Sequence, residues 1–284
     1  MIVKLKNVKK KYEKFDLNVS LSIQEGMITG LIGQNGSGKS TTFKALLNLI
    51  ELDSGEIEIF NEPLNSLSIK DKEKIGVVLS DSFFSEYYTI QDISLLLKNM
   101  YRHFDEETFK KRIHDFNLPF NQAIKSFSTG MKAKLKIICA LSYQAQLLIL
   151  DEPTAGLDVV ARDEILDLLR NFMLENEKNT ILISSHISTD LESLCDDIYL
   201  IHNGRIRLHE QIDEIREQYA ILKVNEQEYQ QLDHTYLLKI KKENYGYACL
   251  TSQRQFYQEN YPKIVIEKAT IDDVLLMNIR GEDL

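Results

Sequence analysis

The chain alternates between short apolar runs and amphipathic stretches, which is the pattern of an α/β protein. Residues 27–32, 147–150 and 180–184 are apolar at nearly every position. Runs of this length are typical of parallel strands that are buried on both faces. Apolar residues at helical spacing follow the first run, and a helix over about 161–177 separates the other two. Strands that alternate with helices predict a central, mostly parallel sheet.

Two regions depart from this pattern. Residues 2–8, 19–23 and 56–60 read as strands, in which apolar and polar side chains alternate. The lysine-rich stretch 9–15 lies between the first two of them. Alternation is typical of antiparallel strands with one exposed face. Residues 89 to about 118 carry an apolar face at helical spacing. The sequence thus predicts an antiparallel β edge and a helical subdomain at about 86–141.

A change in composition marks the last part of the chain. Seven of the thirteen tyrosines lie within residues 219–261, and no phosphate-binding motif occurs there. The region reads as short strands and helices, with strands at 220–224, 236–240, 247–251 and 264–267 and helices at 227–232, 254–261 and 271–279. We therefore expect two domains, 1–214 for the α/β part and 215–284 for a small accessory α+β domain.

Composition and charge exclude several classes of protein. The net charge of −9 argues against a nucleic-acid surface as the main partner. No apolar run approaches the roughly 20 residues that a membrane helix needs, and the N-terminus lacks the long apolar stretch of a signal peptide. Cys139, Cys195 and Cys249 lie far apart in the sequence and do not have the spacing of a metal site. We interpret them as reduced thiols. We expect a cytosolic protein that can dock on a membrane protein.

Residues 33–41, GQNGSGKST, match the phosphate-binding pattern GxxxxGK[ST] at every position. The loop follows a predicted strand and precedes a predicted helix, so its backbone N–H groups and the helix N-terminus converge on one point. Lys39 can reach the β- and γ-phosphates, and the Ser40 hydroxyl can ligate Mg²⁺. A glycine turn that only caps a helix is the alternative. The predicted nucleotide-binding residues are Gly33, Gln34, Asn35, Gly36, Ser37, Gly38, Lys39, Ser40 and Thr41.

Two carboxylates, Asp151 and Glu152, follow directly after the apolar run 147–150. Ligands in α/β sheets bind at the carboxyl ends of the strands, so both side chains are placed for a task there. Asp151 can hold Mg²⁺, and Glu152 can act as a general base toward water. The alternative is that one of them only caps a helix. His186 follows the run 180–184 and would lie near the γ-phosphate if the strands are parallel.

In this order along the chain, these motifs resemble those of an ATP-binding cassette (ABC) ATPase, over about residues 1–214. The most specific segment is Phe127-Ser128-Thr129-Gly130-Met131, upstream of 147–153, since other phosphate-loop families lack it. The resemblance implies an ABC-type P-loop NTPase fold with ATP and Mg²⁺ as cofactors. Residues 269–275 also resemble the C-terminal extension of certain bacterial exporter ATPases.

The resemblance further implies a role for each motif residue. Lys39, Glu152 and His186 would carry hydrolysis, with Glu152 as the catalytic base and His186 as the γ-phosphate switch. Tyr12 would stack on adenine, although an aromatic there is as often simple packing. The implied contacts across a dimer are made by Ser128 and Gly130, which would touch the γ-phosphate held by the opposite subunit, and by Asp158 in the loop that spans the dimer.

The chain departs from the family pattern at three positions. Ser80, followed by Asp81, stands where the family usually has glutamine, so these two side chains are predicted candidates for the metal site beside Ser40 and Asp151. Thr129 replaces the usual glycine and Met131 the usual glutamine. Ser128 and Gly130, on which the phosphate contact depends, are intact.

Taken together, the motifs imply the ATPase subunit of an ABC transporter, cytoplasmic and peripheral at the inner face of the cell membrane. A separate transmembrane permease and a second nucleotide-binding subunit, identical or not, would be its partners. The exporter-like tail favours export of a peptide, antibiotic or lipid-like substrate. One alternative is a soluble ABC ATPase that acts on nucleic acid or the ribosome; the single cassette and the acidic charge oppose it. Another is an ATP sensor that hydrolyses poorly; the intact Glu152 and His186 oppose that.

Overall fold

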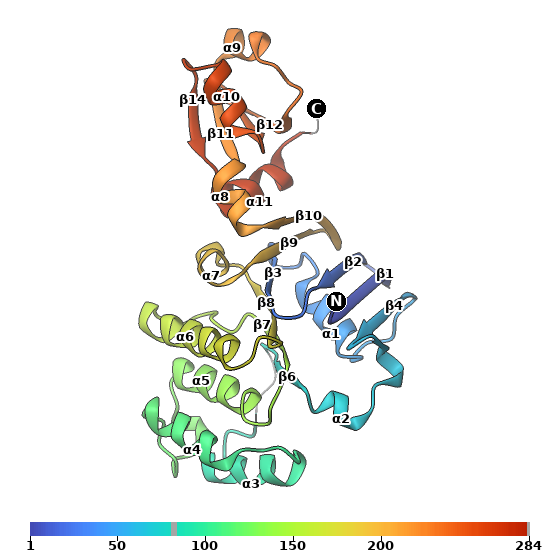
Figure 1. Ribbon diagram of the computed structural model, residues 1–284, viewed down its shortest axis with the longest axis vertical. Helices are drawn as coiled ribbons and strands as arrows, with labels where there is room; N and C mark the ends of the chain where they lie inside the picture. The colour runs from blue at the N-terminus through green and yellow to red at the C-terminus, as the bar shows by residue number, and fades with distance from the viewer. Residues whose placement is uncertain (81–83, 283–284) are drawn as a thin grey trace.

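A six-stranded sheet forms the centre of the molecule in the computed structural model, which describes residues 1–80 and 84–282 (Figure 1). Its strands lie in the order β10-β9-β3-β8-β7-β6. Neighbours from β9 to β6 are parallel, and β10 is antiparallel to β9. The strands are β3 (Ile28–Ile32), β6 (Ile75–Val78), β7 (Leu147–Asp151), β8 (Thr180–Ser185), β9 (Asp197–His202) and β10 (Arg205–Gln211). The predicted mostly parallel sheet is confirmed.

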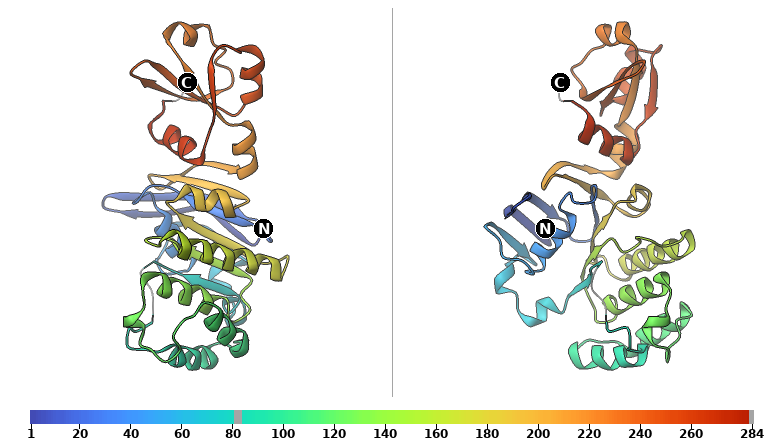
Figure 2. Two further views of the ribbon diagram at one scale, coloured as in Figure 1. Left: turned by 90° about the vertical axis from the view of Figure 1, so that its left-hand side faces the viewer. Right: turned by 180° about the vertical axis from the view of Figure 1, so that it is seen from behind.

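The two faces of the central sheet pack against different layers (Figure 2). Leu147 and Ile149 of β7 face α1 (Lys39–Leu46) and the N-terminal sheet. Leu148 and Leu150 face the helical side, which includes α6 (Val159–Glu175) and α7 (Ser188–Leu194). Every residue of β3, β7 and β8 is buried because both faces of these strands are covered. This burial explains why their sequences lack a polar side.

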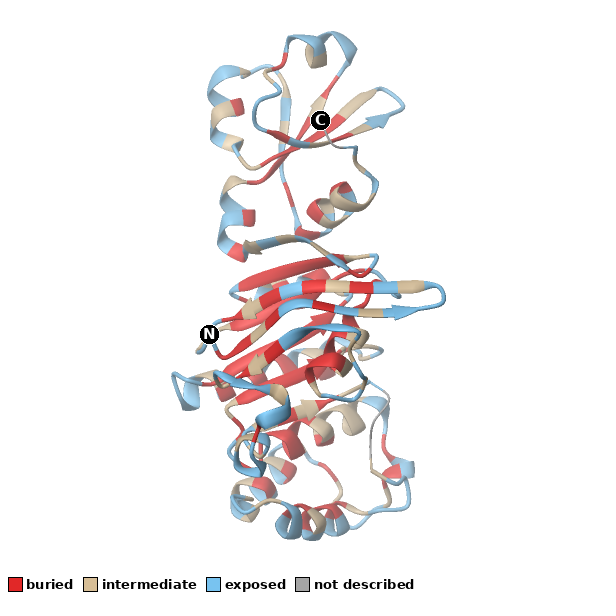
Figure 3. Ribbon diagram, turned by 90° about the vertical axis from the view of Figure 1, so that its right-hand side faces the viewer, coloured by how far each residue is buried: buried red, intermediate tan, exposed pale blue. Residues whose placement is uncertain are grey.

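The N-terminal sheet is antiparallel, in the order β2-β1-β4-β5. Its strands are β1 (Val3–Tyr12), β2 (Phe15–Ile23), β4 (Ser54–Ile59) and β5 (Glu62–Pro63). Buried and exposed residues alternate along β1 and β2, unlike the uniformly buried central strands (Figure 3). The two strands are longer than the sequence predicts, because their pairing continues to Tyr12 and Phe15 although the lysine side chains face solvent. The predicted strand bounds, 2–8 and 19–23, are therefore too short.

A layer of helices lies at one end of the molecule (Figure 1). It contains α3 (Ile90–Met100), α4 (Glu106–Asp115) and α5 (Thr129–Ala140). The predicted continuous helical segment over 89–118 is wrong at residues 101–105. Asp105 starts a new helix there, because its side chain accepts a hydrogen bond from the N–H of Thr108 at 3.0 Å and caps α4.

The remaining sheet lies at the opposite end of the molecule (Figure 1, Figure 2). Its antiparallel strands, in the order β12-β13-β11-β14, are β11 (Ala220–Val224), β12 (Leu237–Glu243), β13 (Gly246–Thr251) and β14 (Val265–Lys268). With α9 (Glu226–Gln231), α10 (Arg254–Asn260) and α11 (Ile271–Arg280) they form what we call the C-terminal unit. The predicted domain boundary at 214 falls inside α8 (Ile212–Gln218).

The short elements α2 (Ile69–Lys72), η1 (Leu64–Ser66) and η2 (Ile124–Ser126) lie in the connections. Across residues 1–80 and 84–282, none of the helices combines the length and apolar character that crossing a bilayer requires.

Candidate active site

Parallel pairing brings three of the predicted motifs to one edge of the central sheet. Ile32 of β3 pairs with Ser185 of β8, and Asp151 of β7 pairs with Ser184. The residues that follow these strands therefore emerge side by side at their carboxyl ends. That edge is where α/β proteins place their ligands.

The phosphate loop leaves β3 and enters α1 in a conformation that requires glycine. Gly38 precedes α1 with φ 116°, and a Cβ added there would lie 2.9 Å from Cζ of Phe15. A Cβ at Gly33 would lie 2.3 Å from the carbonyl oxygen of Ile201. Gln34, Asn35 and Gly36 are exposed at the tip of the loop, Ser37 is buried, and Ser40 and Thr41 are half-buried. The loop is thus packed on one side and open on the other, as phosphate binding needs.

Lys39 connects the phosphate loop to the carboxylates. Its buried ammonium donates a hydrogen bond to the carbonyl oxygen of Gly33 at 2.7 Å and lies 3.2 Å from Oε1 of Glu152. A buried ammonium needs such partners because it has lost its hydration. The ion pair fixes the distance between the phosphate loop and the end of β7.

Glu152 is held by contacts with two further residues, His186 and Ser184, and by an unusual backbone conformation. Its Oε2 accepts a hydrogen bond from the backbone N–H of His186 at 3.2 Å and lies 2.6 Å from His186 Nδ1. Its own N–H donates to Ser184 Oγ at 3.0 Å. The φ of Glu152 is 51°, a left-handed conformation that costs a non-glycine residue about 1–3 kcal/mol. Strain of this kind, at the point where the base is expected, is typical of active sites.

Asp151 lies beneath Glu152 and is only 2% exposed. Its Oδ1 accepts a hydrogen bond from Ser184 Oγ at 2.6 Å, and its Oδ2 accepts one from Ser80 Oγ at 3.5 Å. Carboxylate and hydroxyl oxygens are hard ligands of the kind that Mg²⁺ prefers. The donor set of Asp151 and Ser80, with Ser40 on α1, therefore fits magnesium. The other predicted candidate, Asp81, lies outside the described residues.

Two contacts at this edge were not expected from the sequence. Ser184 bridges Asp151 and the backbone of Glu152. The sequence signal for this role is weak: hydroxyl side chains end a strand that is otherwise apolar. Lys136 of α5 donates hydrogen bonds to the carbonyl oxygens of Leu79 and Ser80, at 3.3 and 3.4 Å. The helical layer thereby holds the segment that replaces the family's glutamine.

Two aromatic residues, Tyr12 and Phe15, flank the turn between β1 and β2, and Phe15 lies beside the phosphate loop. Tyr12 ends β1 and remains 42% exposed, with its ring centroid 6.4 Å from that of Phe15. Phe15 lies against Gly38, a contact that no local pattern in the sequence indicates. The ring of Tyr12 has the Lys10 ammonium 5.9 Å from its centroid and is accessible to solvent, so a base can reach it.

Ser128, Gly130 and Asp158 make local contacts within the helical side. Ser128 is exposed and caps α5, accepting a hydrogen bond from the N–H of Met131 at 3.2 Å. A Cβ at Gly130 would lie 3.1 Å from the Cβ of Ala161, so glycine permits close packing of α5 on α6. Asp158 caps α6 by accepting a hydrogen bond from the N–H of Ala161 at 2.9 Å. Each residue therefore has a structural role in addition to any role in nucleotide contact.

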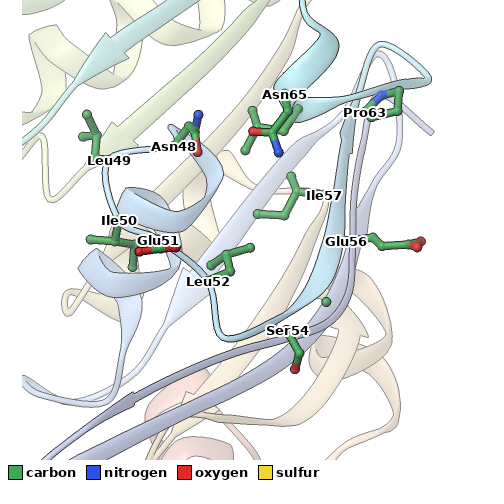
Figure 4. Close-up of a pocket in the computed structure, with 12 residues that line it drawn as sticks. Asn48, Leu49, Ile50, Glu51, Leu52, Ser54, Glu56, Ile57, Pro63 and Asn65 are labelled. Carbon is green, nitrogen blue, oxygen red and sulfur yellow. The ribbon is translucent and has the colours of Figure 1, made fainter.

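One pocket lies at this edge of the central sheet, and a second pocket lies away from it, beyond the end of α1. A pocket of about 310 Å³ is lined by Ser80, Asp151, Glu152 and Thr129, so the start of α5 borders the carboxylates. A larger pocket of about 650 Å³ lies beyond the end of α1 and is lined by residues 48–52 and by β4, with Leu52 beside Ile57 (Figure 4). Among the residues that the structure describes, the lining of this second pocket includes no predicted site residue.

Comparison with known proteins agrees with this geometry. The family model described as "ABC transporter" matches residues 17–155. The lantibiotic transport ATP-binding protein SrtF of Streptococcus pyogenes is 35% identical over 216 residues, which cover 75% of this chain and 92% of that protein. The ABC transporter ATP-binding protein YtrB of Bacillus subtilis is 28% identical over 279 residues, 93% of each chain.

Solved structures agree as well. An ATP-binding subunit of an ABC transporter superposes with a TM-score of 0.68 at 28% identity, covering 77% of this chain and 93% of that one. A dimeric ATP-binding cassette in a post-hydrolysis state, bound to ADP and Pi, gives a TM-score of 0.65 at 25% identity, covering 74% and 98%. The chain therefore belongs to the ABC transporter family, as one of its ATP-binding proteins, and is an ATPase.

Proposed function

We propose that this chain is the ATP-hydrolysing subunit of an exporter and that it drives a separate transmembrane permease. The observation that carries the proposal is the cluster of Lys39, Glu152 and His186 at the carboxyl ends of the parallel strands. Export is supported by relatives that are named for lantibiotic and bacitracin transport; the latter, from Bacillus licheniformis, is 33% identical over 210 residues, 72% of this chain and 68% of that protein. The substrate would be a peptide, antibiotic or lipid-like molecule.

Triphosphate binding is assigned to residues 33–41. Their exposed tip presents backbone N–H groups, and Lys39 lies at the inner end, where its ammonium faces the carboxylates. Ser40, Asp151 and Ser80 would hold magnesium, which neutralises charge on the transferring phosphoryl group when bound. Ser184 keeps the Asp151 carboxylate oriented by its hydrogen bond to Oδ1. The exposed ring of Tyr12 would stack on adenine.

Hydrolysis is assigned to Glu152 as general base. One of its oxygens lies beside Lys39 and the other beside His186, so the carboxylate plane is fixed before reaction. Water attacks the terminal phosphorus, the bond to the bridging β-phosphate oxygen breaks, and Glu152 takes the proton of the water. His186 positions Glu152 and lies next to where the terminal phosphate would be.

A second nucleotide-binding subunit would complete the site. Ser128 is exposed at the N-terminus of α5, so its hydroxyl and the helix N-terminus are available to an anion. Val159 and Val160 are 77% and 70% exposed directly after Asp158. Adjacent exposed valines beside the predicted dimer-spanning loop fit a surface that is covered by another cassette.

The permease is proposed to contact the helical layer. Of the aromatic residues that precede α3, Phe84 packs against the core, whereas Tyr87 is 79% exposed with the Lys125 ammonium 5.6 Å from its ring centroid. Leu95 and Met100 on α3 are also largely exposed. Phe83 lies outside the described residues. An exposed apolar and aromatic surface of this kind favours a protein partner.

The test is to isolate the chain from its source, identify what it binds and measure phosphate release. We expect it to copurify from membranes with a permease at the inner face and to release phosphate from ATP when magnesium is present. Copurification with ribosomes or nucleic acid would contradict the transport proposal. Tight ATP binding without phosphate release would identify an ATP sensor instead.

A further inference from the structure

We propose that Asp190 and Glu192 of α7 are positioning residues that connect the C-terminal unit to the hydrolytic site. This inference rests on the proposed roles of Glu152 and His186. Helix α7 lies between the central sheet and the part of the chain that holds α8 and α11 (Figure 1). One side of α7 contacts the loop after Glu152, and the other side contacts α11.

Asp190 makes the contact toward the site. Its carboxylate is only 2% exposed, and Oδ2 accepts a hydrogen bond from Thr154 Oγ1 at 2.7 Å. Oδ1 lies 3.7 Å from Nε of Arg162 on α6. Thr154 is buried and lies between Glu152 and Asp158 in the chain. Because a buried charge depends on such partners, α7 and the loop 152–158 are constrained to move together.

The start of α7 is also tied to His186. Ser188 begins the helix two residues after His186, and the N–H of the intervening Ile187 donates to Ser185 Oγ at 3.0 Å. A displacement of α7 would therefore change both the position of His186 and the position of the loop that follows Glu152. These are the two segments whose contact, between His186 and Glu152, sets the orientation of the proposed base.

Glu192 makes the contact toward the C-terminal unit. Its Oε1 accepts a hydrogen bond from the N–H of Ile271, the first residue of α11, at 3.0 Å. Its backbone carbonyl accepts a hydrogen bond from the Arg216 guanidinium of α8. The N–H groups in the first turn of a helix have no partner within the helix, so the carboxylate satisfies one of them and opposes the positive end of the helix.

Apolar packing reinforces this junction. Leu191 and Leu194 of α7 are buried in the same core as Val274 and Met277 of α11. The junction is therefore not a mobile tether but a packed contact, through which the position of the C-terminal unit biases α7. Nucleotide bound at one end and the C-terminal unit at the other would then influence each other reciprocally.

The first experiment compares Glu192→Ala with Glu192→Gln by steady-state phosphate release. Alanine removes the acceptor for Ile271 N–H, so kcat should fall by about fivefold or more with little change in KM for ATP. Glutamine retains an acceptor oxygen and should restore most of the rate. Glu259→Ala, an exposed glutamate within the C-terminal unit, is the matched control, and unfolding midpoints exclude global destabilisation. Equal rates for the wild type, Glu192→Ala and Glu259→Ala would overturn the proposal.

The second experiment tests whether bound ATP affects the C-terminal unit. Hydrogen exchange is measured in full-length Glu152→Gln protein with and without MgATP. ATP should slow hydrogen exchange of the Ile271 amide and of the other α11 amides by about fivefold or more. Asp190→Ala should abolish this effect. Asp190→Asn should keep it, because the asparagine side chain can still accept a hydrogen bond from Thr154. Exchange in α11 that does not respond to bound ATP would overturn the link. A wild-type chain that binds ATP without releasing phosphate would instead overturn the proposed function, and the exchange measurement would still test the link.

Discussion

Nδ1 of His186 lies 2.6 Å from Oε2 of Glu152, although the two residues follow different strands of the central sheet, β8 and β7. The contact exists because β7 and β8 are parallel and end in register, with Asp151 opposite Ser184. Glu152 also contacts Lys39 through its other oxygen. The proposed base is therefore the point at which the phosphate loop, β7 and β8 meet.

Replacing the base should separate binding from hydrolysis. Glu152→Gln keeps the shape of the side chain and an acceptor oxygen for the His186 N–H, but it cannot accept a proton. Phosphate release should fall by about 10²–10⁴. ATP binding should persist, and the ATP-bound dimer should live longer on size exclusion. Glu177→Gln, an exposed site, is the control; a wild-type rate in Glu152→Gln would remove the residue from the mechanism.

Ser184 is expected to matter for both stability and magnesium. Ser184→Ala leaves Oδ1 of buried Asp151 without its donor, so the free energy of unfolding should drop by about 1–3 kcal/mol. The carboxylate also loses its fixed orientation, so hydrolysis should need more magnesium. Ser142→Ala is a matched control, since this buried serine donates to the carbonyl oxygen of Ile138 away from the site. If both variants show the same magnesium titration, Ser184 has only a structural role.

Ser80 offers a test of the missing glutamine. Its hydroxyl reaches Asp151 at 3.5 Å, so Ser80→Ala should raise the magnesium concentration needed for half-maximal hydrolysis. Ser80→Gln, which restores the usual family residue, should leave activity intact or raise it. Asp81→Ala should also raise the magnesium requirement if Asp81 belongs to the metal site. An unchanged magnesium titration in each alanine variant would remove that residue from the metal shell.

The ring of Tyr12 should contribute to ATP affinity through its contact with the base. Tyr12→Ala removes the exposed ring, and loss of a base–aromatic stack typically weakens binding by about fivefold to a hundredfold. Tyr12→Phe keeps the ring and should bind as the wild type does. Inorganic triphosphate, which has no base, should bind equally to all three. Should Tyr12→Ala lose no ATP affinity, the ring has only a packing role.

Assembly of the site from two chains is tested at Ser128. Ser128→Arg should bind ATP normally but fail to dimerise or hydrolyse it, because Ser128 is exposed and far along the chain from the phosphate loop. Lys39→Ala should fail because its phosphate loop is impaired. Mixing the two should restore partial phosphate release, since one site of the mixed dimer has both parts intact. Full activity in a monomer, independent of protein concentration, would contradict this scheme and leave Ser128 as a helix cap.

The tail is expected to tune the enzyme rather than bind nucleotide. No predicted nucleotide-binding residue lies beyond residue 214, so truncation near that position should keep ATP binding and change the affinity by no more than the roughly fivefold that the link through α7 predicts. The cut falls inside α8, whose Ile212 and Ile215 are buried, so folding must be verified first. Loss of ATP binding in a truncation that remains folded would contradict the expectation.

The amino-acid sequence by itself determined the phosphate loop, the buried strands and the carboxylates that follow one of them. These features depend on local chemistry: glycine backbone freedom at Gly38, continuous apolar runs, and acidic residues at a strand end. The same local reasoning missed the break at Asp105, where a side-chain cap outweighed a continuous helical pattern.

Only the tertiary structure decided which distant residues meet. His186 reaches Glu152 and Ser184 bridges to Asp151 because the register of β7 and β8 places them together. Lys136 reaches the carbonyl oxygen of Ser80 because α5 packs against β6. Phe15 reaches Gly38 only because β2 folds back beside the loop. The order of the strands depends on how all of the side chains on both faces of the sheet pack together. It therefore cannot be predicted from any short segment of the sequence.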